Sequence, residues 1–172
     1  MTEFFDSEGV NIQARQLGDR LQTLGFKVAT AESCTGGLLA GALTSVPGSS
    51  GWFDQGWVTY TNKAKMQQLG VDSQTLREFG AVSESVARQM AAGALAMAQG
   101  AQLSLATTGI AGPGGATQDK PVGLVWFGFA MRSPDGVIVT ASFQQFDGNR
   151  AQVRHSSVEY ALTQALLLLQ TC

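Results

Sequence analysis

The groups in this sequence that could do chemistry are concentrated in one short turn. Residues 30–37 read TAESCTGG, which combines hydroxyls, a carboxylate and a thiol with two glycines. An apolar pair precedes the turn and the apolar run 38–43 follows it, so we expect it to join a strand to a helix. Such a joint presents free backbone N–H groups and the positive end of a helix dipole, which suit an anion or a developing oxyanion. The turn is therefore a candidate nucleophile or phosphate site, and a tight turn with polar caps is the alternative.

A serine nucleophile in this turn, Ser33, needs a base. The only histidine, His155, follows Arg154 on an expected helix, and we interpret it as a surface residue. Lysine is the usual substitute for histidine in serine hydrolases, but its ordinary pKa of about 10.4 must first be lowered by burial or by a nearby cation. Lys65 lies one turn into an expected helix between apolar residues. A Ser33–Lys65 pair is one hypothesis, and a solvated helix lysine is the other.

Further candidates are open to two interpretations each. Cys34 is either a nucleophile or a small buried residue, and Tyr60 is either a proton relay or an aromatic residue at a sheet edge. Arg150 and Arg154 share a helix face, and with Asn149 they could hold a phosphate, although two solvated arginines would give the same pattern. No residues cluster at the spacings of metal ligands, so we expect no metal.

The elements that must position these residues follow an alternating pattern. The expected helices are 10–24, 38–43, 63–69, 84–99 and 150–170, and the expected strands are 27–32, 52–60, 102–107, 122–131 and 137–146. Strands and helices alternate in the first half and a hairpin closes the second, which predicts an α/β fold, specifically a three-layer α/β/α sandwich with a mixed sheet. Because ligands bind at the carboxyl ends of strands in such sheets, the turn at Ser33 and the loop 108–115 could share one pocket.

Length and composition predict one domain over residues 1–172, with 1–9 as a leader. Hydrophobic residues make up 44% of the chain and charged residues 14%, which is typical of a folded globular protein. The net charge of −2 argues against nucleic-acid binding, and no apolar run is long enough to span a membrane. We interpret Cys34 and Cys172 as free thiols and see no signal peptide, so we expect a cytoplasmic protein. The low charge and 21 glycines also favour subunit contacts.

Several segments in one order closely resemble a known family. They are TAESCTGG (30–37), GSSGWF (48–53), VTYTNKAK (58–65), GAVS (80–83), TGIAGPGG (108–115), KPVG (120–123) and GNRAQVR (148–154). Together they resemble the nicotinamide-nucleotide amidase family, also called the CinA C-terminal domain family. The resemblance extends over nearly the whole chain.

The resemblance implies an amidohydrolase that converts nicotinamide mononucleotide to nicotinate mononucleotide and ammonia, in pyridine-nucleotide salvage, without a cofactor. Matched by position, Ser33 is similar to the family's nucleophile and Lys65 to its general base. Tyr60 and Thr108 correspond to residues that complete the hydrogen-bonded cluster. Members are commonly oligomeric, so the resemblance also implies a homo-oligomer.

Substrate contacts are expected from the two glycine-rich loops and the last helix. These candidates are Thr35, Gly36, Gly37, Gly109, Asn149, Arg150 and Arg154. The family often has Gly-Asp-Arg where this chain has Gly148-Asn149-Arg150, which could change its grip on a phosphate. Two alternatives remain at this point: a non-catalytic nucleotide-binding module in DNA uptake or damage responses, and an amidase for another pyridine or purine nucleotide.

Overall fold

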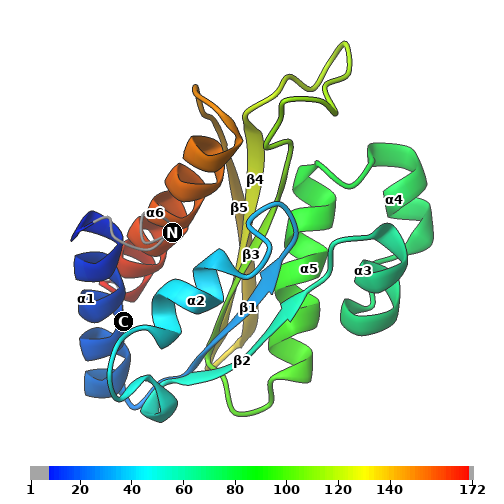
Figure 1. The fold of residues 1–172 in the computed structure, drawn as a ribbon. Coiled ribbons are helices and arrows are strands. Elements are labelled where there is room, and N and C mark those ends of the chain that lie inside the picture. The colour runs from blue at the N-terminus through cyan, green and yellow to red at the C-terminus, as the bar shows by residue number, and fades with distance from the viewer. Residues whose placement is uncertain (1–7, 171–172) are drawn as a thin grey trace.

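A mixed five-stranded sheet in the order β2-β1-β3-β4-β5 forms the centre of the computed structural model (Figure 1). The structure describes residues 8–170. The strands are β1 (Val28–Glu32), β2 (Phe53–Val58), β3 (Leu103–Gly109), β4 (Leu124–Ser133) and β5 (Gly136–Gln145). The helices are α1 (Glu8–Leu24), α2 (Leu38–Thr44), α3 (Asn62–Leu69), α4 (Ser73–Phe79), α5 (Glu84–Met97) and α6 (Arg150–Leu169), with a short 3₁₀ helix, η1 (Ser49–Gly51).

Strand direction brings the ends of three strands to one edge of the sheet. β1 runs parallel to both β2 and β3, whereas β4 and β5 are antiparallel to their neighbours. In this register Glu32 pairs with Val58 on one side and with Thr107 on the other. The residues that follow these three positions therefore leave the sheet side by side, which places the turn after β1 between the segments that follow β2 and end β3.

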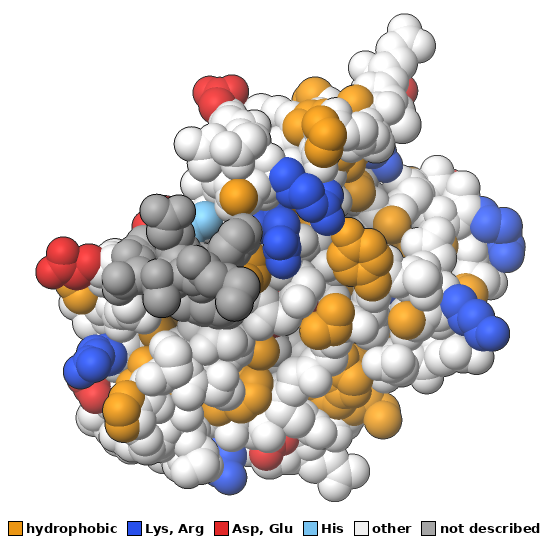
Figure 2. Space-filling model, in the orientation of Figure 1, with side chains coloured by type: hydrophobic (Ala, Val, Ile, Leu, Met, Phe, Trp, Pro, Cys, Tyr) orange, Lys and Arg blue, Asp and Glu red, His pale blue; other side chains and the backbone are white. Residues whose placement is uncertain are grey.

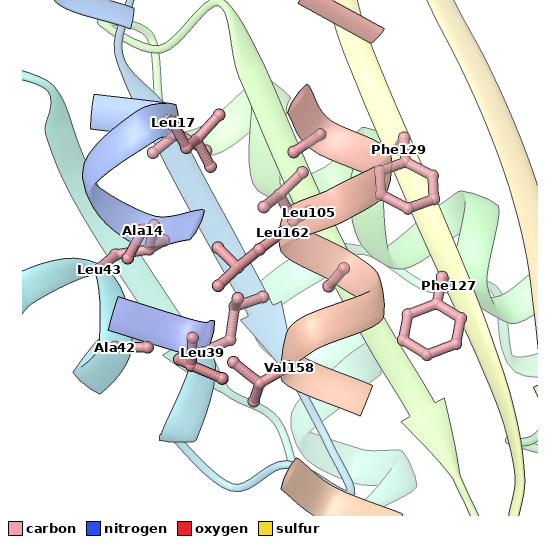
Figure 3. Packing of buried hydrophobic residues seen from close by; sticks show 14 of the residues in the cluster. Ala14, Leu17, Leu39, Ala42, Leu43, Leu105, Phe127, Phe129, Val158 and Leu162 are labelled. Atoms are coloured by element: carbon pink, nitrogen blue, oxygen red, sulfur yellow. The ribbon is translucent and has the colours of Figure 1, made fainter. Parts of the chain in front are cut away.

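Helices cover both faces of the sheet, with α1, α2 and α6 on one side and α3, α4 and α5 on the other (Figure 1). On the first side Leu17, Leu39 and Leu162 come together from three different helices near Leu105 of β3 (Figure 3). On the other side the buried face of α5, including Met90, packs with alanines of β1 and β3 in a second cluster. This arrangement confirms the predicted three-layer α/β/α sandwich and its mixed sheet.

Helix α5 lies close against β4 because one strand residue has no side chain. A Cβ atom on Gly128 would lie 2.0 Å from the carbonyl oxygen of Ala87 in α5. Ser83 caps this helix, as its hydroxyl accepts a hydrogen bond from the Val86 N–H at 3.3 Å. The close packing fixes the start of α5, and with it residues 80–83, beside the end of β3.

Most predicted elements are confirmed, but several boundaries were wrong. Residues 8 and 9 belong to α1 and not to a leader, while the rest of that leader, residues 1–7, lies outside the described residues. Thr108 and Gly109 end β3 instead of starting a loop, because they pair with Trp126 and Val125 of β4.

The helix α4 was not among the expected helices, and it lies between α3 and α5. Asp72 caps that helix by accepting a hydrogen bond from the Thr75 N–H at 2.8 Å. Tyr60, predicted inside a strand, lies two residues beyond the end of β2. Within residues 8–170, no helix is long and apolar enough to cross a membrane. The single-domain organisation of residues 1–172 stays a prediction.

Candidate active site

Ser33 and Lys65 meet although 32 residues separate them in the sequence. Ser33 directly follows β1, where its N–H donates to the carbonyl of Thr107 at 2.9 Å. Lys65 lies in the first turn of α3, a helix that Thr61 caps by accepting from the Ala64 N–H at 3.1 Å. The Nζ atom of Lys65 lies 2.9 Å from Ser33 Oγ. The two side chains of the predicted pair are therefore in direct contact.

The surroundings of Lys65 favour an uncharged amine. The side chain is 1% exposed, and this burial lowers its pKa from 10.5 to about 8. Its Nζ also donates to the carbonyl oxygens of Thr59 at 2.8 Å and of Tyr60 at 3.5 Å. A neutral amine has two N–H groups and one lone pair. The protonated amine donates to Ser33 Oγ as well as to the two carbonyls. Once it loses a proton, its two N–H groups can stay on the carbonyls and its lone pair can face the Ser33 hydroxyl, which is the geometry that a general base requires.

The buried carboxylate of Glu32 accepts hydrogen bonds from the N–H groups at the start of α2. It is fully buried and accepts hydrogen bonds from Thr35 Oγ1 at 2.6 Å and from the N–H groups of Gly37, Leu39 and Ala40 at 3.0, 3.0 and 2.8 Å. The unpaired N–H groups at the helix start are thus satisfied within the protein. The Gly37 N–H, in a residue predicted to bind substrate, is one of those that Glu32 occupies.

Two backbone donors of the turn are left over. The Ser33 and Gly36 N–H groups donate to the carbonyls of Thr107 and Ser33, respectively. Within the described part of the chain, no other residue accepts from the N–H groups of Cys34 and Thr35, and the Cys34 N–H lies against its own thiol. Thr35 is fully buried and Cys34 is 6% exposed, so the Cys34 N–H is the one of the two that could stabilise an oxyanion formed at Ser33, as N–H groups do in acyl-transfer enzymes.

Arg154 reaches the same turn from α6. Its Nε donates to the carbonyl of Cys34 at 3.1 Å, and its Nη2 donates to the carbonyl of Thr35 at 2.9 Å. Gly36 lets the guanidinium approach, because a Cβ atom there would lie 3.3 Å from Nη2 and the residue has φ +59°. Arg154 was predicted to bind substrate, and that role stays a prediction.

The start of α6 carries the two other residues predicted to hold a phosphate. The side chain of Asn149 caps α6 by accepting from the N–H groups of Ala151 and Gln152 at 2.9 and 3.1 Å. Arg150 donates to the carbonyl of Gly112 at 2.8 Å and to the Tyr60 hydroxyl at 2.9 Å. Basic side chains gather beside hydrophobic ones between α6 and the turn after β1 (Figure 2). Phosphate binding by Asn149 and Arg150 stays a prediction.

The predicted four-residue cluster is only partly assembled. Tyr60 contributes its carbonyl to Lys65, but its side chain is 55% exposed and bonds to Arg150. Thr108 is buried on β3, and its hydroxyl donates to the carbonyl of Ala81 at 2.8 Å. Gly109 lies against β4, since a Cβ atom there would be 2.7 Å from the Leu124 carbonyl oxygen. The chemical roles of these residues stay predictions.

Two residues that hold the turn in place were not among the predicted site residues: Glu32, at the end of β1, and Thr107 of β3. The hydroxyls of Thr107 and Thr35 lie 2.7 Å apart. Because the Thr35 hydroxyl donates its hydrogen to Glu32, Thr107 is the donor in this second bond. A signal for Glu32 was present in the sequence, as an acidic residue at the end of an apolar strand is costly to bury unless it caps the helix that follows.

The competing candidates have other surroundings. Burial raises the pKa of the free thiol of Cys34 to about 12, so it is not a thiolate nucleophile at neutral pH. His155 pairs with Glu159 at 3.5 Å on the surface of α6. In the part of the chain that the structure describes, no three His, Cys, Asp or Glu residues come together as metal ligands. Cys172 lies outside the described residues.

A cavity of about 520 Å³ lies beside residues 79–84, the segment whose Ala81 carbonyl accepts from Thr108. Residues 79 and 82–84 form one wall, and Trp126 and Phe143 form another. None of the predicted site residues lines it. The chemical groups thus lie outside this cavity, at the edge of the sheet where β1 and β3 end.

Known proteins resemble this chain over nearly its whole length. A nicotinamide-nucleotide amidohydrolase PncC of Enterobacter agglomerans is 50% identical over 88% of this chain and 90% of its own length. A protein of the same name from Escherichia coli strain K12 is 46% identical over 91% of this chain and 92% of its own. The crystal structure of the competence/damage inducible protein CihA from Agrobacterium tumefaciens superposes with a TM-score of 0.87 at 45% identity, covering 95% of this chain and 97% of that one.

The family model of the CinA C-terminal domain matches residues 11–169. This range contains every element from α1 to α6 except the first three residues of α1, and it includes the Ser33 turn and the lysine that contacts it. The protein therefore belongs to the CinA C-terminal domain family.

Proposed function

We propose that this protein is a nicotinamide-nucleotide amidohydrolase, which hydrolyses the carboxamide of nicotinamide mononucleotide to nicotinate mononucleotide and ammonia, as in pyridine-nucleotide salvage. The observation that carries the proposal is the 2.9 Å contact between Ser33 Oγ and the buried amine of Lys65. The two relatives that bear this activity in their names, at 50% and 46% identity, support the choice of substrate. No metal or organic cofactor is needed for the steps below.

In the first half of the reaction, Ser33 is acylated. Neutral Lys65 takes the hydroxyl proton of Ser33 while Oγ forms a bond to the carboxamide carbon, and the C=O electron pair moves onto oxygen. The N–H group of Cys34 then stabilises the oxyanion, and one such donor contributes about 3 kcal/mol in comparable enzymes. The carbonyl re-forms, the C–N bond breaks, and the Lys65 ammonium gives its proton to the leaving nitrogen, which departs as ammonia.

In the second half, water releases the product. Lys65 is neutral again and takes a proton from a water molecule as that water attacks the ester carbon. Collapse of this second intermediate breaks the bond to Ser33 Oγ, which regains its proton from Lys65. Nicotinate mononucleotide leaves, and the site returns to its starting state.

We assign the phosphate end of the substrate to the open side of the site. Arg150 and Tyr60 are exposed there, and their bonded side chains present a guanidinium group and a hydroxyl to the outside. Arginine is well suited to phosphate because it offers several N–H donors in one plane. The glycine-rich loops, with Thr35, Gly36, Gly37 and Gly109, are expected along the path between the phosphate and Ser33. A homo-oligomeric state and a cytoplasmic location are part of the same proposal.

The direct test is ammonia release from nicotinamide mononucleotide by the purified protein. We expect turnover by the unchanged chain and none above background by Ser33→Ala, which should still bind the substrate. Near-normal turnover by Ser33→Ala would remove Ser33 from the mechanism. Absence of ammonia with the unchanged chain would favour a nucleotide-binding module without catalysis.

The pH dependence of turnover tests the base. Only neutral Lys65 can accept a proton, and its pKa is lowered to about 8 by burial. We therefore expect kcat/KM to rise with pH through one ionisation near pH 8 and to level off above it. A profile that is flat between pH 6 and pH 10 would contradict a lysine base.

A further inference from the structure

Arg154 bonds to the backbone of the nucleophile turn instead of facing outward. Both of its hydrogen bonds to the turn end on main-chain carbonyls, those of Cys34 and Thr35, at 3.1 and 2.9 Å. These residues directly follow Ser33, and 120 positions separate Cys34 from Arg154 in the sequence. A helix on one face of the sheet is thereby tied to the turn that carries the nucleophile.

Peptide geometry connects this contact to the free donors of the turn. A trans peptide unit is planar, so its C=O and its N–H point in opposite directions. The carbonyl of Cys34 belongs to the same peptide unit as the N–H of Thr35. When Arg154 holds that carbonyl, it also fixes the direction of the Thr35 N–H, from which no other residue within 8–170 accepts. Arg154 thus fixes the peptide unit that directly follows the Cys34 N–H.

The same turn is fixed from a second side. The Thr35 hydroxyl donates to buried Glu32 at 2.6 Å, so the side chain and the carbonyl of Thr35 are both held. Gly36 has no side chain to push the guanidinium away. Glu32 and Arg154 therefore hold the turn from two sides.

We propose that Arg154 is a positioning residue that holds the turn carrying Ser33 and the Cys34 N–H in place, and that it acts on turnover more than on phosphate binding. This inference rests on the proposed amidase function. The inference gives the two arginines of α6 different roles. Arg154 acts on the reaction through the backbone of the turn, whereas Arg150 belongs to the open side where substrate enters.

The test compares Arg154→Lys and Arg154→Met with the unchanged chain on nicotinamide mononucleotide. Lysine keeps the charge but loses the planar fork that reaches two carbonyls at once. We expect both variants to lose kcat by about 10²-fold, the effect of losing one oxyanion donor. Substrate affinity is measured separately, by calorimetry of nicotinamide mononucleotide binding to Ser33→Ala and to Ser33→Ala/Arg154→Lys. A phosphate ligand at Arg154 would show in this affinity. The two dissociation constants should agree within about threefold.

A matched control distinguishes positioning from the docking of α6. Tyr160→Phe removes a hydrogen bond of 3.1 Å between α6 and Ser142 of β5 and leaves the turn alone. Its kcat should stay unchanged even if its melting temperature falls. Should Arg154→Met fail to fold, Arg154→Lys decides the question.

Three results would overturn the inference. The first is a normal kcat in Arg154→Lys and Arg154→Met. The second is a tenfold or larger loss of binding in Ser33→Ala/Arg154→Lys with kcat preserved in Arg154→Lys, which would make Arg154 a phosphate ligand. The third is absence of ammonia release by the unchanged chain, which would overturn the proposed function as well, whereas the first two leave that function standing.

Discussion

The site has two parts that are built in different ways: an inner turn, here residues 32–37 with Lys65 beside them, and an outer rim formed by Tyr60 and Arg150. In the inner turn, Glu32, Thr35 and Lys65 are at most 1% exposed, and each makes at least two hydrogen bonds to the protein. In the rim, Tyr60 is 55% exposed and Arg150 is also exposed, and one hydrogen bond of 2.9 Å joins them. The first region is held rigidly before substrate arrives, and the second can rearrange around it.

This difference separates two tasks. Groups that stabilise a transition state are most effective when they are already oriented, because no reorganisation is then needed during the reaction. Groups that recognise the distant end of a substrate gain from exposure, since substrate must reach them from water. We therefore expect changes in the inner turn to lower kcat strongly, and changes in the rim to act mainly and weakly on KM.

The largest effect is expected for the base. Lys65→Met removes the proton acceptor and should lower kcat by at least 10³-fold, within the range known for general acid–base catalysis. Steady-state kinetics measure it. The matched control is Lys63→Met, which changes an exposed lysine on the same helix and should leave kcat unaltered. Comparable turnover by both variants would contradict a catalytic role of Lys65 and with it the distinction between inner turn and rim.

The next effect concerns the support of the turn. Glu32→Gln places an amide N–H₂ group against one of the N–H groups that the carboxylate now accepts, which costs about 1–3 kcal/mol of folding free energy. We expect a lower melting temperature and a kcat reduced by about tenfold or more. Glu78→Gln, at an exposed position, serves as control. A variant that loses stability but keeps full kcat would show that the turn tolerates movement.

A smaller effect is expected at the rim. Tyr60→Phe removes the hydroxyl that accepts from Arg150 but keeps the main-chain carbonyl near Lys65. Because the lost bond is exposed, it is worth only about 1 kcal/mol, and KM should rise by less than tenfold with kcat nearly constant. A 10³-fold loss of kcat would instead assign the tyrosine hydroxyl to the chemical steps.

The smallest effect is expected for the buried thiol. Cys34→Ala should change kcat by less than about twofold, since burial raises the pKa of this thiol to about 12 and suppresses the thiolate. In a Cys172→Ser background, iodoacetamide should also label the folded protein slowly at pH 8. Rapid labelling with loss of activity would mean that the inner turn opens more readily than its burial indicates.

The sequence predicted the fold and the central pair, but not the network around the pair. Alternating apolar segments sufficed for the sandwich, and the motif around Ser33 with the scarcity of histidine pointed to Lys65. The contacts of Arg154 with Cys34 and Thr35 have no such signal, because their partners are main-chain carbonyls 119 and 120 residues away. Thr108 was expected beside Ser33, yet its hydroxyl turns to the carbonyl of Ala81, which only the packing of residues 80–83 against β3 determines.

The buried amine also affects how the chain folds. In the unfolded chain Lys65 titrates near 10.5, and in the folded protein near 8, so between these two pH values the unfolded form binds more protons. Stability therefore rises with pH across this window, and below pH 8 the fold carries the full free-energy cost of a dehydrated ammonium group. Replacing the lysine by an apolar residue would remove that dependence on pH. A laboratory selection for heat resistance alone would consequently tend to discard the very side chain that gives the protein its reactivity.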